Sequence, residues 1–302
     1  MRQKNKRKKR LVSSLLLLLL VTSLCLVALL FKDQVKEQVL DFLPKSHHVN
    51  KQGTKTVKTK SKKASLKTVT WTKKDQPVKI PILMYHAVHV MAPEEAANAN
   101  LIVDPQTFES QIKALKEDGY YFLSPEEAYR VLTKNEVPAE KVVWLTFDDS
   151  MKDFYTTAYP ILRKYQAKAT NNVITGFTQE NRPSNLTVAE MKEMKKKGIS
   201  FQDHTVNHPD LEMSDPTTQE VEMKDSMDFL NQNLNQETMA IAYPAGRYSD
   251  TTLEIAKNLH YKLGVTTNEG LASATDGLLS LNRVRIMPNT QAKDLLNYIQ
   301  TN

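Results

Sequence analysis

Val142-Val-Trp-Leu-Thr-Phe-Asp-Asp149 runs as an unbroken apolar segment into two adjacent carboxylates, and this segment sets the fold class. A short continuous apolar run is typical of a parallel strand buried on both faces, because a strand with one wet face alternates between apolar and polar residues. The run therefore predicts a buried parallel strand. Asp148 and Asp149 are expected at the C-terminal end of that strand.

Strand-like and helix-like segments alternate on both sides of this run. Further strands are expected at 79–88, 120–123, 169–174, 199–202, 239–243, 262–265 and around 284–287. Helices are expected at 105–116, 152–165, 187–197, 219–233 and 251–259, and a further one begins at Ser124-Pro-Glu-Glu127. Ser124 with Glu127, and Thr187 with Glu190, read as capping boxes. The alternation predicts a single α/β domain, a distorted or incomplete (β/α) barrel of about seven parallel strands with its chemistry at their C-terminal ends.

The basic charge of the chain belongs to its first quarter. The 302 residues carry a net charge of +7 from 41 Lys and Arg and 34 Asp and Glu. Residues 1–75 hold 19 of these basic residues and 4 of the acidic ones, which leaves residues 76–302 at −8. A nucleic-acid-binding surface needs its basic residues on a folded face, so nucleic acid is not an expected partner. No obligate protein partner is inferred.

The N-terminal segment has the pattern of a membrane anchor. Residues 1–10 hold seven basic residues and form the expected cytoplasmic tail, while residues 11–31 are apolar with only Ser, Thr and Cys interruptions. This length crosses a bilayer as a helix, and the preceding positive charge predicts that the rest of the chain is extracellular. An uncleaved single-pass signal anchor is expected, and a cleaved signal peptide with secretion is the alternative. Residues 32–75 predict a flexible basic stalk before a folded domain at 76–302.

His204-Thr-Val-Asn-His208, which follows a predicted strand, is the second chemical motif. Two imidazoles four residues apart can face one way from a single turn, and a strand-terminal carboxylate can complete three protein ligands of a divalent ion. Such a site keeps positions open for water and substrate, which predicts hydrolysis. A helix cap formed by Asp148 and Asp149, and loop histidines packed around Pro209, are the structural alternatives.

Three titratable side chains complete the candidate chemistry. Asp148 and Asp149 repel each other unless their roles differ, so one can bind metal while the other stays free. Pro81-Ile-Leu-Met-Tyr-His86 is another apolar strand that ends on a titratable side chain. At the mouth of a barrel, His86 can protonate a leaving amine. The alternative is that His86 caps a strand-end carbonyl.

These motifs resemble those of the polysaccharide deacetylases, carbohydrate esterase family four. Thr-Phe-Asp-Asp and His-Thr-Val-Asn-His match two motifs of that family intact. The resemblance covers roughly residues 78–290. It implies that Asp148 is the general base and that Asp149, His204 and His208 bind the metal.

The third family motif, Arg-x-Pro-Tyr-Gly, is altered here. It is represented by Ala242-Tyr-Pro-Ala-Gly246, so the Arg and Tyr positions hold Ala242 and Ala245. The resemblance implies that the backbone N–H of Ala245 still donates to an oxyanion. The missing Arg orients the base in the family, and we expect Arg283, in a late strand, to take over that task.

His86 stands at the start of the domain, and the usual C-terminal Leu-His motif is absent. This order is similar to the permuted subgroup that includes the poly-N-acetylglucosamine deacetylases, and it implies that His86 is the catalytic acid. Tyr243 and Tyr248 are expected at the mouth of the site, in contact with the substrate.

The implied activity is metal-dependent hydrolysis of N-acetyl groups from N-acetylglucosamine units of a cell-wall or extracellular polysaccharide, with release of acetate. The expected ion is Zn²⁺, with Co²⁺ or Ni²⁺ as alternatives. The polymer is peptidoglycan, poly-N-acetylglucosamine or the unit that links a secondary polysaccharide to the wall. An O-acetyl esterase and an inactive glycan-binding domain are the alternative functions. A glycosidase is disfavoured, because adjacent carboxylates rarely flank a sugar ring.

Overall fold

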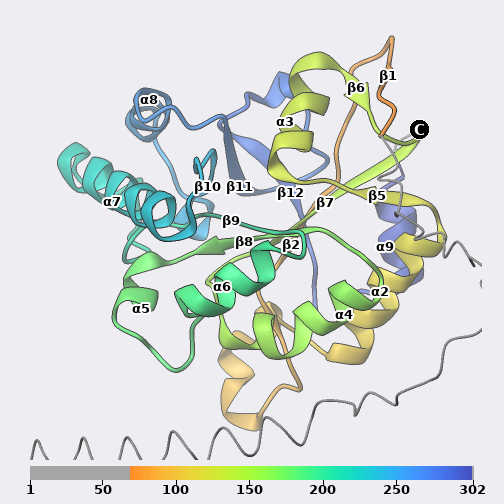
Figure 1. Ribbon diagram of the computed structural model, residues 1–302, viewed down its shortest axis with the longest axis horizontal. Coiled ribbons are helices and arrows are strands. Elements are labelled where there is room, and N and C mark those ends of the chain that lie inside the picture. The colour runs from red at the N-terminus through yellow and green to blue at the C-terminus, as the bar shows by residue number, and fades with distance from the viewer. Residues whose placement is uncertain (1–68, 301–302) are drawn as a thin grey trace, which may run out of the picture. The chain divides into compact units, whose positions relative to one another are not determined.

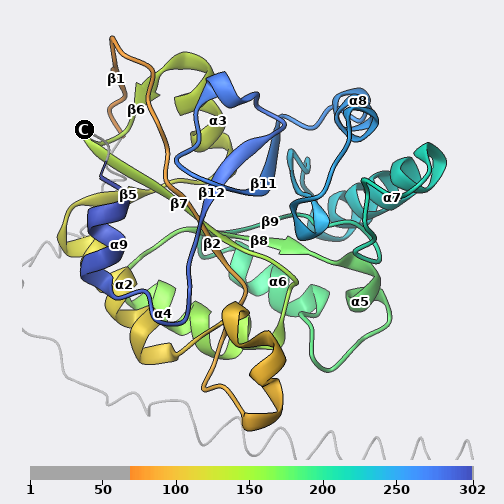
Figure 2. The same ribbon diagram turned by 180° about the vertical axis from the view of Figure 1, so that it is seen from behind.

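The computed structural model describes residues 69–300, which form a closed barrel of parallel strands with helices around it (Figures 1 and 2). The ring runs through β2 (Ile82–Tyr85), β12 (Leu281–Arg285), β11 (Leu263–Glu269), β10 (Ala240–Ala242), β9 (Ile199–Asp203), β8 (Ala169–Val173) and β7 (Lys141–Phe147). It closes because β7 also pairs with β2. An eighth strand, β5 (Tyr120–Phe122), pairs with the first half of β7. The prediction of one barrel with about seven parallel strands is confirmed.

Helices follow most of the strands, and Figures 1 and 2 show α2, α4 and α6 along one side of the barrel. The α-helices are α2 (Pro105–Glu117), α3 (Pro125–Lys134), α4 (Tyr159–Lys164), α5 (Thr175–Gln179), α6 (Val188–Lys195), α7 (Pro216–Leu234), α8 (Asp250–Asn258) and α9 (Ala292–Tyr298). Helical segments of other types are the 3₁₀-helices η1 (Pro93–Leu101), η3 (Pro244–Gly246) and η4 (Ala274–Asp276) and the π-helix η2 (Phe154–Ala158). Both predicted capping boxes are present at the starts of α3 and α6.

Strand β7 is buried on both faces. Val143, Leu145 and Phe147 belong to one hydrophobic cluster, whereas Val142 and Trp144 belong to another. Successive side chains of a strand point to opposite faces, so the two clusters lie on the two sides of β7. This double burial explains why the run from 142 to 147 shows no polar alternation.

The folded domain begins before residue 76. β1 (Thr72–Lys73) pairs antiparallel with β6 (Glu136–Val137), and the guanidinium carbon of Arg130 lies 4.1 Å from the centre of the Trp71 ring. The predicted boundary between residues 75 and 76 is therefore placed too late in the chain. A separate parallel pair consists of β3 (Ala87–Val88) and β4 (Ile102–Val103).

Several predicted elements have different bounds in the structure. The expected helix 152–165 is interrupted by the π-helical turn η2, which ends at Ala158, two residues before Pro160, a residue that lacks the N–H needed for an α-helical hydrogen bond. The last strand begins at Leu281 rather than near 284, because Leu281 already pairs with Val265 of β11. The short helices α5 and α9 were not predicted.

Within residues 69–300, no helix has the length and apolar character needed to cross a bilayer. The predicted cytoplasmic tail at 1–10, the anchor at 11–31 and most of the stalk at 32–75 lie outside the described residues. These assignments stay predictions.

Candidate active site

Side chains from the C-terminal ends of several barrel strands meet at one end of the barrel. Asp148 and Asp149 follow β7, His86 follows β2 and His204 follows β9. The backbone N–H of Asp148 donates to the carbonyl of Tyr85 at 3.0 Å, so the ends of β2 and β7 are level. The fold therefore brings the predicted residues of three separate motifs to one place.

Asp149, His204 and His208 form a possible metal site. Their ligand atoms lie within 4.8 Å of one another. Asp149 Oδ1 is 3.4 Å from His204 Nε2 and 3.8 Å from His208 Nε2. Ligands about 2.0–2.1 Å from a tetrahedral zinc ion are separated by roughly 3.3 Å. The donor types and their spacing thus fit one divalent ion with little movement.

A backbone carbonyl orients the ring of His204. His204 Nδ1 lies 2.6 Å from the oxygen of Ala242. A carbonyl only accepts, so Nδ1 carries a proton and Nε2 is the atom turned toward Asp149. Burial lowers the pKa of His204, but the hydrogen bond to Asp149 and the charges of Asp148 and Asp149 outweigh burial and raise it. Two negative charges thus favour a cation at this position.

The turn between the two histidines has an unusual backbone that its surroundings hold in place. Thr205 and His208 have φ values of 65° and 59°, in the left-handed region that disfavours non-glycine residues. The N–H of Thr205 donates to Asp203 Oδ1 at 2.6 Å, and the N–H of His208 donates to Thr205 Oγ1 at 3.0 Å. Gly176 donates its N–H to the carbonyl of Val206 at 2.8 Å, and a Cβ on Gly176 would lie 2.6 Å from that oxygen. Glycine is therefore required at this approach.

Asp148 is buried against an equally buried arginine. Arg283 Nη1 donates to Asp148 Oδ1 at 3.0 Å, and Nη2 donates to Oδ2 at 2.7 Å. Arg283 Nε also donates to the carbonyl of Thr266 at 2.7 Å. Burial favours a higher pKa for Asp148, but the charge of Arg283 outweighs it and holds the pKa well below its usual range. The expected contact between Arg283 and Asp148 is present, and the lowered pKa favours the ionised form of the carboxylate.

His86 lies in the field of the same charges. The pairing of β2 with β7 places His86 level with Asp148. Burial lowers the pKa of His86; Asp148 and Asp149 oppose this effect, Arg283 and Arg285 reinforce it, and the pKa stays below its ordinary value. A lowered pKa makes the protonated ring a stronger acid, which suits donation to a departing group.

The three residues expected near the altered third motif lie in different surroundings. Tyr243 is fully buried, and its hydroxyl donates to the carbonyl of Leu279 at 2.8 Å. The prediction that Tyr243 lies at the mouth is therefore wrong, because the polar end of its ring is satisfied inside the protein. Tyr248 is half-buried against the Tyr243 ring, with ring centres 5.2 Å apart. Ala245 has a φ of 52° in η3. The substrate-binding roles of Tyr248 and Ala245 stay predictions.

Two asparagines at the site were not predicted. Asn172 Nδ2 donates to Asp148 Oδ1 at 2.7 Å, and Asn185 Nδ2 donates to the carbonyl of Asp149 at 3.0 Å. The available signal for the first was the pair Asn171-Asn172 inside a strand that is otherwise apolar or small. Most buried polar side chains have a hydrogen-bond partner, so an asparagine in a buried strand points to a polar site nearby, as Asn172 does here.

A groove of about 430 Å³ opens beside the candidate metal site. It is lined by Asp149, Met151, Ile174, Phe177, Arg182, Ser184, Asn185, Asn207 and His208. Because two of the three metal-binding residues form part of its wall, this groove is the candidate path for substrate.

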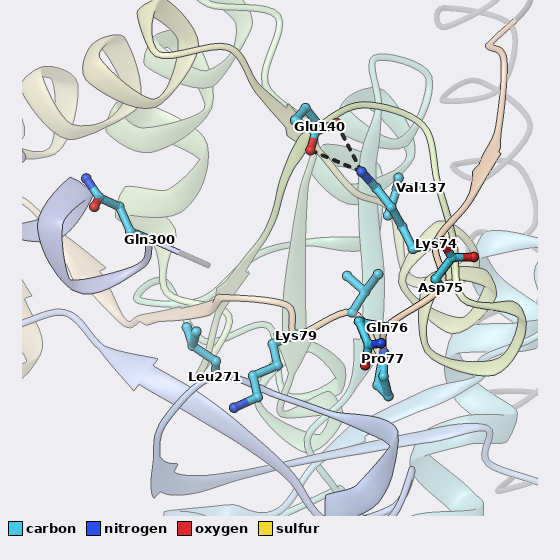
Figure 3. Close-up of a pocket in the computed structure, with 10 residues that line it drawn as sticks. Lys74, Asp75, Gln76, Pro77, Lys79, Val137, Glu140, Leu271 and Gln300 are labelled. Carbon is cyan, nitrogen blue, oxygen red and sulfur yellow. Dashed lines mark hydrogen bonds and ion pairs between the residues drawn. The ribbon is translucent and has the colours of Figure 1, made fainter. Parts of the chain in front are cut away.

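A second pocket, of about 610 Å³, contains none of the predicted site residues (Figure 3). Lys79 and Glu140 line it, and each shortly precedes a barrel strand, so it lies toward the N-terminal ends of β2 and β7. Lys74 and Glu140 form an ion pair of 3.0 Å in its wall. In (β/α) barrels this end contributes to stability rather than to chemistry.

Removal of one metal-binding side chain is expected to abolish tight metal binding. His204→Gln loses one of three protein ligands, and we expect its affinity for Zn²⁺ to fall more than about 100-fold, since even residues that only orient a ligand affect affinity by roughly 10 to 100-fold. Metal content after dialysis against a weak chelator measures this. His89→Gln is the matched control, because His89 is not one of the three residues. Equal metal content in the two variants would contradict the site.

In the segment that follows His86, the side chain of His89 lies between two carboxylates, a contact called the His89 clasp below. His89 Nδ1 lies 2.7 Å from Asp153 Oδ2, and His89 Nε2 lies 3.1 Å from Glu95 Oε1. The N–H of Val88 donates to the same oxygen of Asp153 at 2.8 Å. Burial lowers the pKa of His89, but the hydrogen bonds to Asp153 and Glu95 outweigh it and raise the pKa.

This clasp predicts a pH-dependent stability. A pKa that is higher in the folded state stabilises the fold fully below the unfolded value of about 6.5, and the contribution is lost as the pH rises through the folded pKa. The urea midpoint of wild type should therefore exceed that of His89→Gln most at about pH 5.5, below the unfolded pKa, and the difference should shrink above that pKa. A difference that does not change with pH would show that His89 is not protonated in the clasp.

The fold and the site together define a known class of enzyme. A family model described as polysaccharide deacetylase matches residues 125–264. YxkH of Bacillus subtilis (strain 168), a protein assigned to the polysaccharide deacetylases, is 39% identical over 234 residues, which cover 78% of this chain and 81% of YxkH. The chain belongs to the polysaccharide deacetylase family. His86 and Arg283 lie outside the range that the family model matches.

Two further relatives are informative. The structure of the Streptococcus pyogenes deacetylase PplD in complex with acetate is 67% identical, has a TM-score of 0.73, and covers 75% of this chain and 100% of its own. The poly-β-1,6-N-acetyl-D-glucosamine N-deacetylase of Staphylococcus aureus is 34% identical over 182 residues, 56% of this chain and 62% of that enzyme. The match thus spans less than two thirds of the staphylococcal enzyme.

Proposed function

We propose that this polysaccharide deacetylase uses a divalent ion to hydrolyse N-acetyl groups of N-acetylglucosamine units in a cell-wall or extracellular polysaccharide. The observation that carries the proposal is the buried Asp148, paired with Arg283 beside Asp149, His204 and His208. The staphylococcal relative, named as an N-deacetylase of such a polymer, supports the substrate class. The acetate in the streptococcal structure matches the proposed product.

Asp149, His204 and His208 would hold the ion, with Zn²⁺ expected first and Co²⁺ or Ni²⁺ as alternatives. When bound, such an ion polarises the acetyl carbonyl and acidifies a water molecule. The carboxylate and the two imidazoles are three protein ligands, a number that is typical of catalytic sites and leaves room for substrate.

The other residues carry the proton transfers. Asp148 accepts a proton from the attacking water, and Arg283 keeps it ionised for that task. The backbone N–H of Ala245 donates to the oxyanion that develops on the acetyl oxygen. His86 donates a proton to the departing amine, for which its lowered pKa is favourable. The products are acetate and a free amine on the sugar.

We also propose that a single-pass N-terminal helix anchors the enzyme to the cell membrane, with its catalytic domain outside. The apolar run at 11–31 after a basic tail supports this arrangement. The residues between this helix and β1 would then act as a stalk that lets the enzyme reach wall or extracellular polymers. Fractionation of cells tests the anchor: recovery in the washed membrane pellet supports it, whereas recovery in the culture medium supports a cleaved signal.

The activity is tested with the full-length chain, stripped of metal and reloaded with Zn²⁺. Acetate and free amines are measured after incubation with isolated cell walls, poly-N-acetylglucosamine and N-acetylglucosamine oligomers. Equal yields of acetate and amine, dependent on metal, are the expected result, and the best substrate identifies the polymer. Acetate without amines would indicate an O-acetyl esterase. Bound metal without any acetate release would indicate a glycan-binding domain.

A further inference from the structure

The hydrogen bonds to Asp148 are unequally shared between its two oxygens. Arg283 donates once to each oxygen, at 3.0 Å to Oδ1 and 2.7 Å to Oδ2. Asn172 Nδ2 adds a third bond, at 2.7 Å, to Oδ1 alone. An ionised carboxylate has about four lone-pair positions, two on each oxygen. Oδ1 is therefore filled, whereas Oδ2 retains one free position.

We propose that Asn172 is a positioning residue that blocks Oδ1 of Asp148, so that only Oδ2 accepts the proton from the attacking water. This inference rests on the proposed function and identifies which oxygen of Asp148 accepts the proton. A base that presents a single free lone pair fixes the direction from which water attacks. Such an orientation is worth large factors in rate, because small misplacements of reacting groups are costly.

The position of Asn172 in the barrel supports this role. The pairing of β7 with β8 runs through Phe147 and Asn171, so the next residues, Asp148 and Asn172, lie side by side at the strand ends. Asn172 is almost fully buried, and its partner is an ionised carboxylate, which can only accept. The side chain must therefore present Nδ2 rather than its oxygen to Asp148.

The neighbouring Asn171 is a buried asparagine that does not bond Asp148. Asn171 is fully buried, and neither of its amide atoms has a hydrogen-bond partner among residues 69–300. Adjacent residues in a strand point to opposite faces, so Asn171 faces away from Asp148. The two asparagines share strand, burial and size, which makes Asn171 a matched control.

The test compares Asn172→Leu and Asn172→Ala with Asn171→Leu in the zinc-loaded full-length chain. We expect kcat to fall roughly 10 to 100-fold in both Asn172 variants while KM stays within about two-fold, because the lost interaction acts in the transition state rather than in substrate binding. Asn171→Leu should keep the wild-type kcat. The Ala variant provides the result if the Leu side chain does not fit the site.

A second background separates positioning from simple structural damage. In Asp148→Asn, residue 148 can no longer accept the proton from water, so adding Asn172→Leu should cause no further loss of kcat. If Asn172→Leu instead damages the fold, its loss of kcat should add to that of Asp148→Asn. Independently of activity, the side-chain amide ¹⁵N signal of Asn172 should shift in Asp148→Asn, whereas that of Asn171 should not.

The possible failures are distinguishable. A wild-type enzyme that releases no acetate with any metal would overturn the proposed function and this inference together. An active wild type, with folded Asn172 variants whose kcat stays within two-fold of Asn171→Leu, would overturn only the role of Asn172. An Asn172 amide signal that is insensitive to Asp148→Asn would also overturn it.

Discussion

Asp148→Asn is expected to release acetate about 10²–10⁴-fold more slowly than wild type, the usual contribution of a general base. The amide has the same shape as the carboxylate but cannot accept the proton of the attacking water. Asp148 is buried and ionised beside Arg283, so no solvent group can easily replace it. Acetate release at saturating substrate by the zinc-loaded full-length enzyme measures the loss.

A matched variant serves as the control for indirect effects of an Asp→Asn change. Asp228→Asn makes the same chemical change on α7, where the Asp228 side chain is 45% exposed and forms an ion pair with Lys224. It should retain wild-type activity, and both variants should bind one zinc ion. If Asp148→Asn keeps its metal and most of its activity, Asp148 is not the base, and the assignment passes to another group at the strand ends.

The parts of the fold that could be predicted are those whose causes are local in sequence. β7 is recognisable because burial on both faces leaves Thr146 as the one polar residue in the run 142–147. The starts of α3 and α6 were recognisable because a cap and its partner are three residues apart. Long-range pairing sets the other boundaries: β1 belongs to the domain only because β6 lies beside it.

The same distinction holds for the site. The candidate metal ligands lie in two short motifs, and their convergence follows from the general rule that parallel strands end at one face of a barrel. Arg283 reaches Asp148 across 135 residues, so it was found only through the Arg missing from the third motif. Tyr243 was misplaced because its partner, the carbonyl of Leu279, comes from a distant loop. Asn172 was missed for the same reason, since its partner Asp148 follows another strand, β7.

Arg283→Met is expected to destabilise the metal-free protein by roughly 3–5 kcal/mol, the usual cost of removing one partner of a buried ion pair. The guanidinium is fully buried and also bonds Thr146 and the carbonyl of Thr266. Without it, the carboxylate of Asp148 stays buried without its counter-charge. Urea denaturation of wild type and variant measures the difference in the free energy of unfolding, and acetate release should fall as well, since the base loses its orientation.

A double variant shows whether the lost stability comes from the unpaired, buried charge of Asp148. Asp148→Asn removes that charge, so Arg283→Met with Asp148→Asn should be more stable than Arg283→Met alone, although it lacks one more native group. In wild type, the pKa of Asp148 is lower in the folded state, so its stabilising contribution is present above the unfolded pKa and is lost as the pH falls. The stability deficit of Arg283→Met should therefore be largest near neutral pH and shrink in acid. A deficit that is unchanged by pH and by Asp148→Asn would mean that Arg283 stabilises the barrel by packing, and that its ion pair with Asp148 contributes little.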